Sequence, residues 1–208
     1  METNPDIIET NRARLSGELL SEPAFSHKTY GEAFYEVLLG ITRSSGYCDE
    51  IRVQISERLL CGLVLKRGMK AAVRGQVRTY NEETDGRSRL HIVVFAREFE
   101  VIPDGTECFF ENEIFLDGHI CKPPLRRTSP LGREICDIML AVNRMYNKSD
   151  YIPCIAWGRN AAYSGMLEVG MRLTLTGRIQ SREYRKRDAV GNSTLHVAYE
   201  VSIVKIEG

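Results

Sequence analysis

The sequence predicts an all-β protein made of two tandem copies of one small barrel. The first observation behind this prediction is internal repetition, because residues 11–54 match residues 112–155 at a constant shift of 101. Nine identities occur, where unrelated segments of average composition would share about two or three. The second observation is that short segments of each copy alternate apolar and polar residues, which is typical of half-buried strands. The identical pairs are Asn11/Asn112, Leu15/Leu116, Gly17/Gly118, Pro23/Pro124, Gly31/Gly132, Leu39/Leu140, Arg43/Arg144, Asp49/Asp150 and Ile51/Ile152.

The order of the predicted elements is the same in both copies. The first copy has strands at 12–20, 33–43, 50–56, 70–80 and 89–102, and a helix-like stretch at 57–66 that ends near Gly68. The second copy has strands at 113–121, 134–144, 151–157, 172–184 and 194–206, with the helix-like stretch at 158–168. Five strands with one short helix between the third and the fourth is the order of the OB-fold, a five-stranded Greek-key barrel.

The repeat also predicts where one barrel ends and the next begins. The match resumes at a shift of 102 and again at 105, which indicates one inserted residue in mid-domain and three more before the last strand. Turn-forming residues cluster at 103–106, so we expect an N-terminal domain over 1–104 and a C-terminal domain over 105–208. The resumed matches are Gly68-Met69 with Gly170-Met171, Gly75 with Gly177, and Leu90-His91 with Leu195-His196.

The third strand differs between the copies on the face that points away from the core. Ile51, Val53 and Ile55 alternate with polar residues in the first copy, so they are predicted to face the core. The same parity in the second copy places Tyr151 and Trp157 on the outer face, where the first copy has Glu50 and Ser56. Strand aromatics often pack in a core or a subunit interface. The comparison of the copies favours an exposed platform, and exposed apolar patches generally mark binding surfaces.

Basic residues gather in the second copy. Residues 1–111 hold 14 Lys and Arg against 18 Asp and Glu, and residues 112–208 hold 14 against 10, so the zero total conceals net charges of −4 and +4. The fourth strand of the second copy puts Arg172, Arg178, Arg182 and Tyr184 on one face, and Arg185-Lys186-Arg187 follows in a predicted hairpin. Cations that hold phosphates, interleaved with rings that stack on unpaired bases, are typical of proteins that bind single strands without sequence preference.

Composition argues against several other classes. The chain is 43% hydrophobic and 27% charged, an ordinary globular composition. We expect no membrane span, because no apolar run nears about 18 residues, and no secretory signal in the acidic N-terminus. The six cysteines form no Cys-x-x-Cys pair, so we expect reduced thiols in a cytoplasm and neither a structural metal nor a cofactor. We find no phosphate-binding Gly-rich loop and no hydrolase motif, and therefore predict a protein that is not an enzyme.

Three stretches of the second copy resemble the bacterial single-stranded DNA-binding proteins. They are Leu140–Arg144, Asp150–Arg159 and Gly177–Tyr184. The resemblance spans about 112–206 and implies base stacking at four aromatic positions, which here are Tyr146, Tyr151, Trp157 and Tyr184. The predicted DNA-binding set combines these rings with the cations Arg144, Arg172, Arg178, Arg182, Arg185, Lys186 and Arg187. The first copy has Ser45, Glu50 and Ser56 at three of the positions and Tyr80 only near the fourth, so we expect it to bind weakly or to be structural. Tyr47 is a partial substitute for the missing aromatics of that copy.

The sequence therefore predicts binding of single-stranded DNA by the second copy, in support of DNA replication, recombination or repair. The family usually assembles four OB-folds, which a homodimer of this chain would reproduce, and the expected location is the cytoplasm, with the nucleoid. The family usually carries an acidic tail that recruits replication and repair enzymes; the chain ends after its last predicted strand, so tail-mediated recruitment is not expected. The alternative is an accessory or primosome-type OB protein whose aromatic face binds a protein partner, and binding of RNA also stays open.

Overall fold

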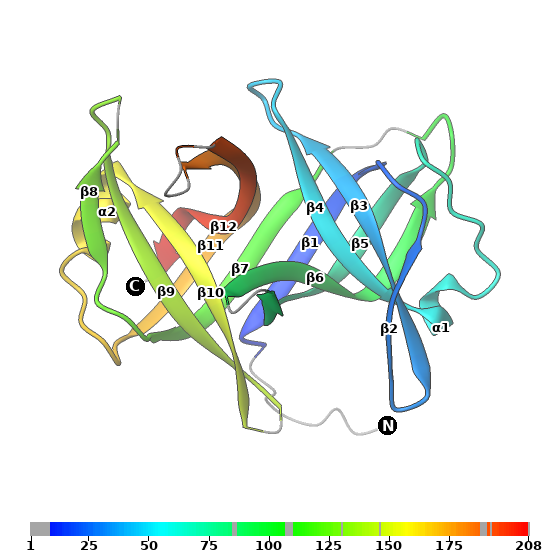
Figure 1. The fold of residues 1–208 in the computed structure, drawn as a ribbon, viewed down its shortest axis with the longest axis horizontal. Helices are drawn as coiled ribbons and strands as arrows, with labels where there is room; N and C mark the ends of the chain where they lie inside the picture. Colours follow the sequence, from blue (N-terminus) through cyan, green and yellow to red (C-terminus); the bar gives the residue numbers. More distant parts are fainter. Residues whose placement is uncertain are drawn as a thin grey trace.

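Each half of the chain folds into six strands and one short helix (Figure 1). The computed structural model describes residues 9–84, 87–106, 110–129, 131–145, 147–187, 191 and 193–207. The N-terminal half consists of β1 (Asn11–Leu19), β2 (Ala24–Thr29), β3 (Glu32–Thr42), β4 (Cys48–Ser56), α1 (Glu57–Leu60), β5 (Lys70–Thr84) and β6 (Arg87–Ile102). The C-terminal half consists of β7 (Asn112–Ile120), β8 (Leu125–Thr128), β9 (Glu134–Arg144), β10 (Lys148–Trp157), α2 (Gly158–Ser164), β11 (Arg172–Arg187) and β12 (Ser193–Glu207).

Five strands of each half close into a barrel, which confirms the predicted fold class. In the N-terminal half the order is β1-β3-β4-β6-β5, and β5 pairs with β1 again. The β4–β6 pair is parallel and the other pairs are antiparallel, as in an OB-fold. The closure brings β1 close to β3 at Gly17, where an added Cβ would lie 2.3 Å from the carbonyl oxygen of Gly40. Gly118 plays the same part in the C-terminal half, so the repeat preserved the two glycines that close approach of the strands requires.

The structure adds one strand per half to the predicted five and shortens the helices. Residues 24–29, which lie between the first two predicted strands, form β2, which pairs with β3 at the edge of the barrel. All six residues of β2 are exposed, so no apolar alternation marks the strand in the sequence. The helices α1 and α2 have four and seven residues; Gly165 directly follows α2, and Gly62 lies two positions after the end of α1.

The core lies inside the two barrels and follows the predicted parity. Ile51, Val53 and Ile55 of β4 are fully buried, and Ile152 and Ala156 of β10 are buried at the matching positions. The third matching residue of β10, Cys154, is buried as well, and this burial raises the pKa of its thiol. The prediction of which β10 residues face the core is thus confirmed.

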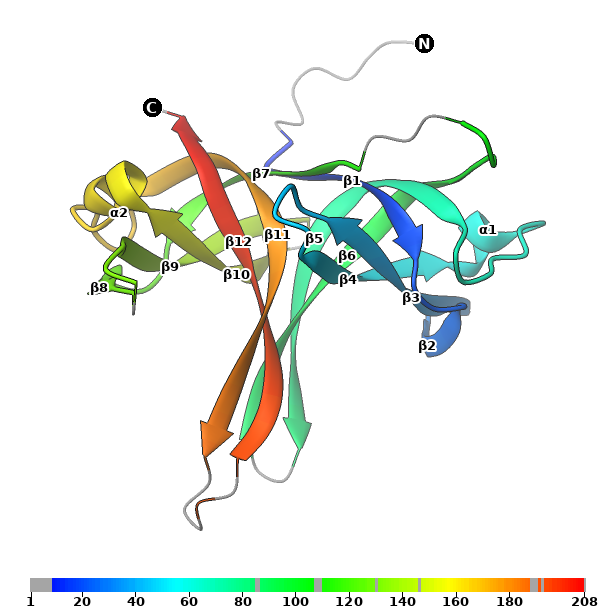
Figure 2. The same ribbon diagram turned by 90° about the horizontal axis from the view of Figure 1, so that it is seen from above.

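A pseudo-twofold axis relates the halves, which share one continuous 12-stranded sheet. The strands β1 and β7 pair antiparallel, with Asn11 opposite Leu116 and Leu15 opposite Asn112. Because Asn11 repeats as Asn112 and Leu15 as Leu116, each pair is the other pair's image. Figure 2 shows β1 and β7 side by side along one edge of the molecule.

The long hairpins β5–β6 and β11–β12 extend together from the opposite side (Figure 2). They correct the predicted alignment of the last strand. Val94 pairs with Val53 of β4, and Val201 pairs with Cys154 of β10, so these strands repeat at a shift of 107 rather than 105. The identity of Leu90-His91 with Leu195-His196 therefore does not mark equivalent positions in the two barrels. The extra residues lie in the longer β11–β12 hairpin, and so His91 and His196 are not equivalent.

Candidate nucleic-acid interface

Two aromatic side chains of β10 stand on its outer face. Tyr151 is 52% exposed and Trp157 is 37% exposed, so neither ring belongs to the core. They are six positions apart in the strand, which corresponds to about 20 Å. Between them, Ile155 shares the same face but is only 3% exposed. The two aromatic rings are therefore the most exposed apolar side chains of this face, and each ring lies in a separate groove.

The groove around Trp157 is rich in arginine; we call it the Trp157 groove. It has a volume of about 810 Å³ and lies where β10, β11 and β12 meet the β8–β9 and β3–β4 turns. The indole Nε1 donates a hydrogen bond of 3.3 Å to Ser202 Oγ on β12, which sets the orientation of the ring. Charged residues that line the groove are five arginines and two glutamates: Arg43, Arg127, Arg133, Arg178, Arg182, Glu183 and Glu200. The wall is thus cationic beside an exposed indole.

The arginines of the Trp157 groove differ in how firmly they are held. Arg127 makes a bidentate contact with Asp137, at 2.5 and 3.0 Å. Arg182 lies 3.8 Å from Glu200, whose carboxylate also accepts a hydrogen bond from Gln180. Arg133 and Arg178 make no ion pair with a described carboxylate. Those two side chains are the ones most available to an incoming anion.

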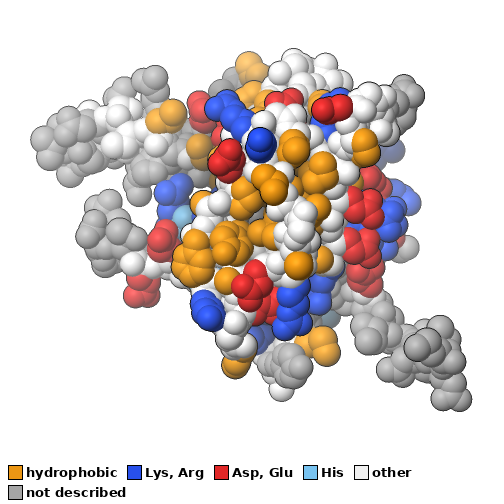
Figure 3. Space-filling view, turned by 90° about the vertical axis from the view of Figure 1, so that its right-hand side faces the viewer, with side chains coloured by type: hydrophobic (Ala, Val, Ile, Leu, Met, Phe, Trp, Pro, Cys, Tyr) orange, Lys and Arg blue, Asp and Glu red, His pale blue; other side chains and the backbone are white. Residues whose placement is uncertain are grey.

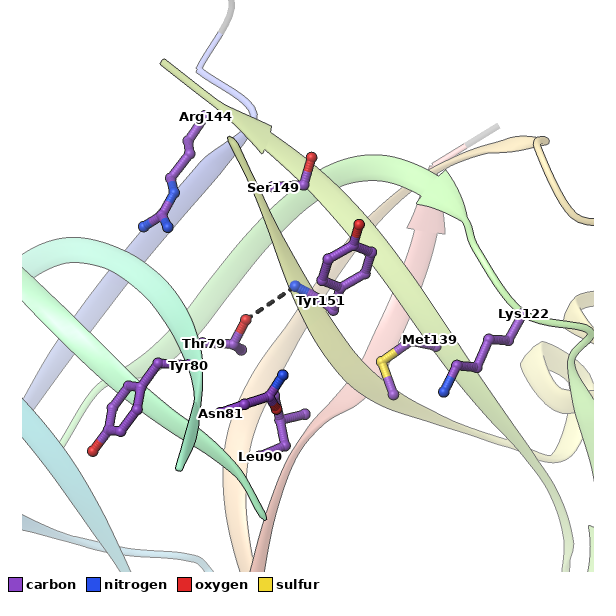
Figure 4. A pocket seen from close by; sticks show the side chains of 9 residues that line it. All are labelled: Thr79, Tyr80, Asn81, Leu90, Lys122, Met139, Arg144, Ser149 and Tyr151. Atoms are coloured by element: carbon purple, nitrogen blue, oxygen red, sulfur yellow. Dashed lines mark hydrogen bonds between the residues drawn. The ribbon is translucent and has the colours of Figure 1, made fainter. Parts of the chain in front are cut away.

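A second groove surrounds Tyr151 (Figure 4); we call it the Tyr151 groove. It has a volume of about 630 Å³, and its lining includes Tyr80, Lys122 and Arg144 but no carboxylate. In Figure 4 the β9 and β10 side chains of the C-terminal half face the β5 and β6 side chains of the N-terminal half. Tyr80 is 42% exposed and stacks on His91, with ring centroids 5.1 Å apart. In Figure 4 the Tyr80 ring points away from Tyr151, so Tyr151 is the exposed ring that this groove presents.

Two buried aspartates join the halves beside these grooves. Asp150 accepts a hydrogen bond from the Thr79 backbone N–H at 2.9 Å and an ion pair from Arg78 at 2.9 Å. Its equivalent, Asp49, accepts from the Ser181 backbone N–H at 2.8 Å and from Arg43. Burial lowers the pKa of Arg78, although its contacts with Asp150 oppose that shift. The hydrogen bonds to Asp49 raise the pKa of Arg43. Both halves therefore shape both grooves.

The structure brings most of the described members of the predicted set into these grooves. Arg178 and Arg182 join Trp157, and Arg144 joins Tyr151. Arg172 lines neither groove; it makes two hydrogen bonds to Asp117, at 2.8 and 2.6 Å, which lower the pKa of that carboxyl. Tyr146 lies outside the described residues. The side chains of the last four members lie outside the described part too, although their backbone belongs to β11: Tyr184, Arg185, Lys186 and Arg187.

Sequence reasoning missed four basic residues that line the grooves: Arg43, Lys122, Arg127 and Arg133. It named Tyr47 and Tyr80 only as aromatics of the first copy and did not place them beside Trp157 or Tyr151. One signal was present, because Arg43/Arg144 and Asp49/Asp150 are identical pairs of the repeat and all four residues lie at the junction of the halves. Among the described residues no His, Cys, Asp and Glu cluster could hold a metal ion, and no helix is long and apolar enough to cross a membrane.

Comparison with known proteins points to one family. The family model described as "Single-strand binding protein family" matches residues 111–205. A single-stranded DNA-binding protein of Clostridium tetani is 32% identical over 84 residues, which cover 37% of this chain and 58% of that protein. Single-stranded DNA-binding protein 2 of Clostridium acetobutylicum is 30% identical over 96 residues, which cover 43% of this chain and 72% of that protein.

A solved structure extends the likeness to both halves. The wild-type single-stranded DNA binding protein from Thermus aquaticus superimposes with a TM-score of 0.75 at 22% identity, covering 95% of this chain and 91% of that one. This likeness shows that the tandem arrangement of two OB-folds is shared. The match to the family model over residues 111–205 and the 30% identity to a relative of which 72% is covered show that the chain belongs to the single-strand binding protein family.

Proposed function

We propose that the protein binds single-stranded DNA without sequence specificity and does not catalyse a reaction. The observation that carries the proposal is the half-exposed indole of Trp157 in a groove lined by five arginines. Every base has a π-face, so a ring that is open to solvent can stack on any unpaired base, while guanidinium groups hold the phosphates between bases. The family model matches residues 111–205, and the charge of +4 over residues 112–208 supports binding there.

The spacing of the two exposed rings and the chemistry of base stacking favour an unpaired strand over a duplex. The rings of Tyr151 and Trp157 lie on one strand face about 20 Å apart, a distance that an extended single strand can span with several bases between them. Stacking needs bases that are already unpaired, and a duplex hides their faces.

Such a protein serves DNA replication, recombination and repair wherever single strands are exposed, which in a bacterium is the nucleoid. A homodimer would provide four barrels, and sedimentation equilibrium measures whether it forms.

Salt dependence of binding to dT oligomers tests the proposal. If about four groove cations contact phosphates, the logarithm of the affinity falls with the logarithm of the salt concentration at a slope of about −3, from about −0.7 per contact on single strands. Arg133, Arg178, Lys122 and Arg144 are the first candidates for these contacts. An affinity that does not change with salt contradicts the proposal. No mobility shift at micromolar protein and low salt would instead favour a module whose aromatic face binds a protein partner.

A further inference from the structure

We propose that the N-terminal half completes the DNA site of the C-terminal half by supplying Tyr47 as a base-stacking residue in the Trp157 groove. The inference rests on the proposed function and deepens it, because it assigns a DNA contact to the half whose own outer face on β4 is polar. Tyr47 occupies none of the four aromatic positions of the family resemblance. It lies in the turn between β3 and β4 of the N-terminal half, yet it lines the same groove as Trp157.

The turn holds the ring of Tyr47 in a fixed place. Its backbone closes with two hydrogen bonds, from Arg43 N–H to the Tyr47 carbonyl at 2.8 Å and from Gly46 N–H to the Arg43 carbonyl at 2.9 Å. Gly46 has a φ of 84°, a conformation that glycine adopts without strain. Tyr47 is 43% exposed, so its ring is available to a ligand in the groove.

Arg43 supports this ring from one face. Its Cζ lies 4.8 Å from the centroid of Tyr47, which is cation–π distance. The guanidinium is itself fixed, because its Nε and Nη2 donate to the two carboxylate oxygens of Asp49 at 2.6 and 2.5 Å. A ring whose one face packs on an immobilised cation keeps the opposite face for an incoming base, with little side-chain entropy left to lose on binding.

The same aspartate ties the turn to the C-terminal half. Asp49 is fully buried and accepts hydrogen bonds from the backbone N–H and the hydroxyl of Ser181, at 2.8 and 3.3 Å. Arg43 Nη2 also donates to the Ser181 carbonyl at 3.3 Å. Ser181 lies between Gln180 and Arg182, which both line the Trp157 groove. The position of Tyr47 is therefore set relative to the DNA-facing residues of β11 and not only relative to its own barrel.

Comparison of the two copies shows that the contacts between the halves do not depend on the ring of Tyr47. Arg43 and Asp49 recur as Arg144 and Asp150, and Asp150 makes the corresponding contacts with the N-terminal half. Tyr47 does not recur, because Lys148 stands at its position in the other copy. The junction thus forms in one copy without an aromatic residue at this place, so packing of the halves does not require the ring of Tyr47. Its presence in the arginine-rich groove is explained by stacking on a base.

Replacement of the ring tests the inference, with a matched tyrosine as control. Tyr47→Ala is expected to weaken binding of a dT oligomer fivefold to tenfold, the lower range for one base–aromatic stack. Tyr47→Phe keeps the ring and stays within twofold of the wild type. Tyr163→Ala removes a tyrosine of α2 with similar exposure, 45%, that lines neither groove, and it also stays within twofold. Affinities are compared at one salt concentration, and urea unfolding confirms that each variant is folded.

Photocrosslinking gives a readout that does not depend on any substitution. An oligomer that carries 5-iodouracil is expected to crosslink to the tryptic peptide containing Tyr47 as well as to the peptide containing Trp157. If the wild type binds dT and its Trp157 emission is quenched, but Tyr47→Ala binds like Tyr163→Ala and no crosslink maps to residue 47, this inference is wrong and the proposed function stands. If the wild type does not bind dT at all, the proposed function itself fails.

Discussion

Replacing Trp157 by alanine removes the ring on which the proposed function depends. The indole is 37% exposed, so one face is open to a base, and a stacked base is worth about 1–3 kcal/mol. At 1.4 kcal/mol for each factor of ten, Trp157→Ala is expected to weaken dT binding by about fivefold to 150-fold. The substitution also leaves Ser202 Oγ without its 3.3 Å partner, which costs about 1 kcal/mol of folding free energy. Fluorescence anisotropy of a labelled dT oligomer at fixed salt measures the affinity.

Trp157→Phe distinguishes stacking from hydrogen bonding. Phenylalanine keeps an aromatic face but loses the Nε1 donor to Ser202, so its affinity is expected to fall by only a few fold. If Trp157→Ala, shown by urea unfolding to be folded, binds the oligomer as tightly as the wild type, the ring is not a platform for bases. Equal losses in the alanine and phenylalanine variants would mean that the indole N–H, rather than the ring face, is what matters.

Three further predictions use other parts of the structure. Tyr151→Ala combined with Trp157→Ala is expected to lose the sum of the two separate binding free energies in anisotropy titrations, because the rings lie in different grooves about 20 Å apart; a strong coupling would mean that one base contacts both. Arg172 lowers the pKa of Asp117. A carboxyl whose pKa is lowered in the folded protein stabilises the fold at pH values above its unfolded pKa of about 4. This stabilisation is lost as the pH falls through the folded pKa. Arg172→Ala should therefore reduce the loss of stability on acidification below about pH 4 in urea titrations, and change dT affinity less than Arg178→Ala does; an unchanged acid dependence would contradict the assignment. Burial raises the pKa of the Cys154 thiol, so mass spectrometry should find it unmodified by iodoacetamide in the native protein while exposed thiols react; early modification would show that β10 opens.

The fold was predictable because duplication provides its own control. A match between two copies in one chain does not depend on recognising any strand, and the parity of the β4 core residues fixed which β10 residues face outward. The strands β2 and β8 were missed since all their residues are exposed and nothing alternates. The sequence aligns the last strand of the two copies two residues out of register, because two identical residues in the hairpin suggest a shift of 105. The correct shift of 107 follows from the pairing of β6 with β4 and of β12 with β10, which only a structure reveals.

The site was predictable only where it lies on one strand. Tyr151 and Trp157 follow from the period of two along β10. The grooves around them depend on contacts between residues far apart in the chain: Asp49 reaches Ser181 across 132 positions, and Asp150 reaches Thr79 across 71. No local pattern encodes such contacts. Parity shows which side of its strand Arg172 faces, but it does not show that Asp117 on β7 binds the guanidinium.

Titration of the intrinsic tryptophan fluorescence with poly(dT) tests the central claim most directly. The chain has one Trp, and it lies in the arginine-lined groove, so the whole tryptophan emission reports on that place. Stacking of thymine on the indole predicts strong, saturable quenching that is reversed by high salt, as phosphate contacts are released. An emission that stays unchanged while anisotropy shows a complex with the same DNA would place the strand elsewhere on the protein and contradict the account.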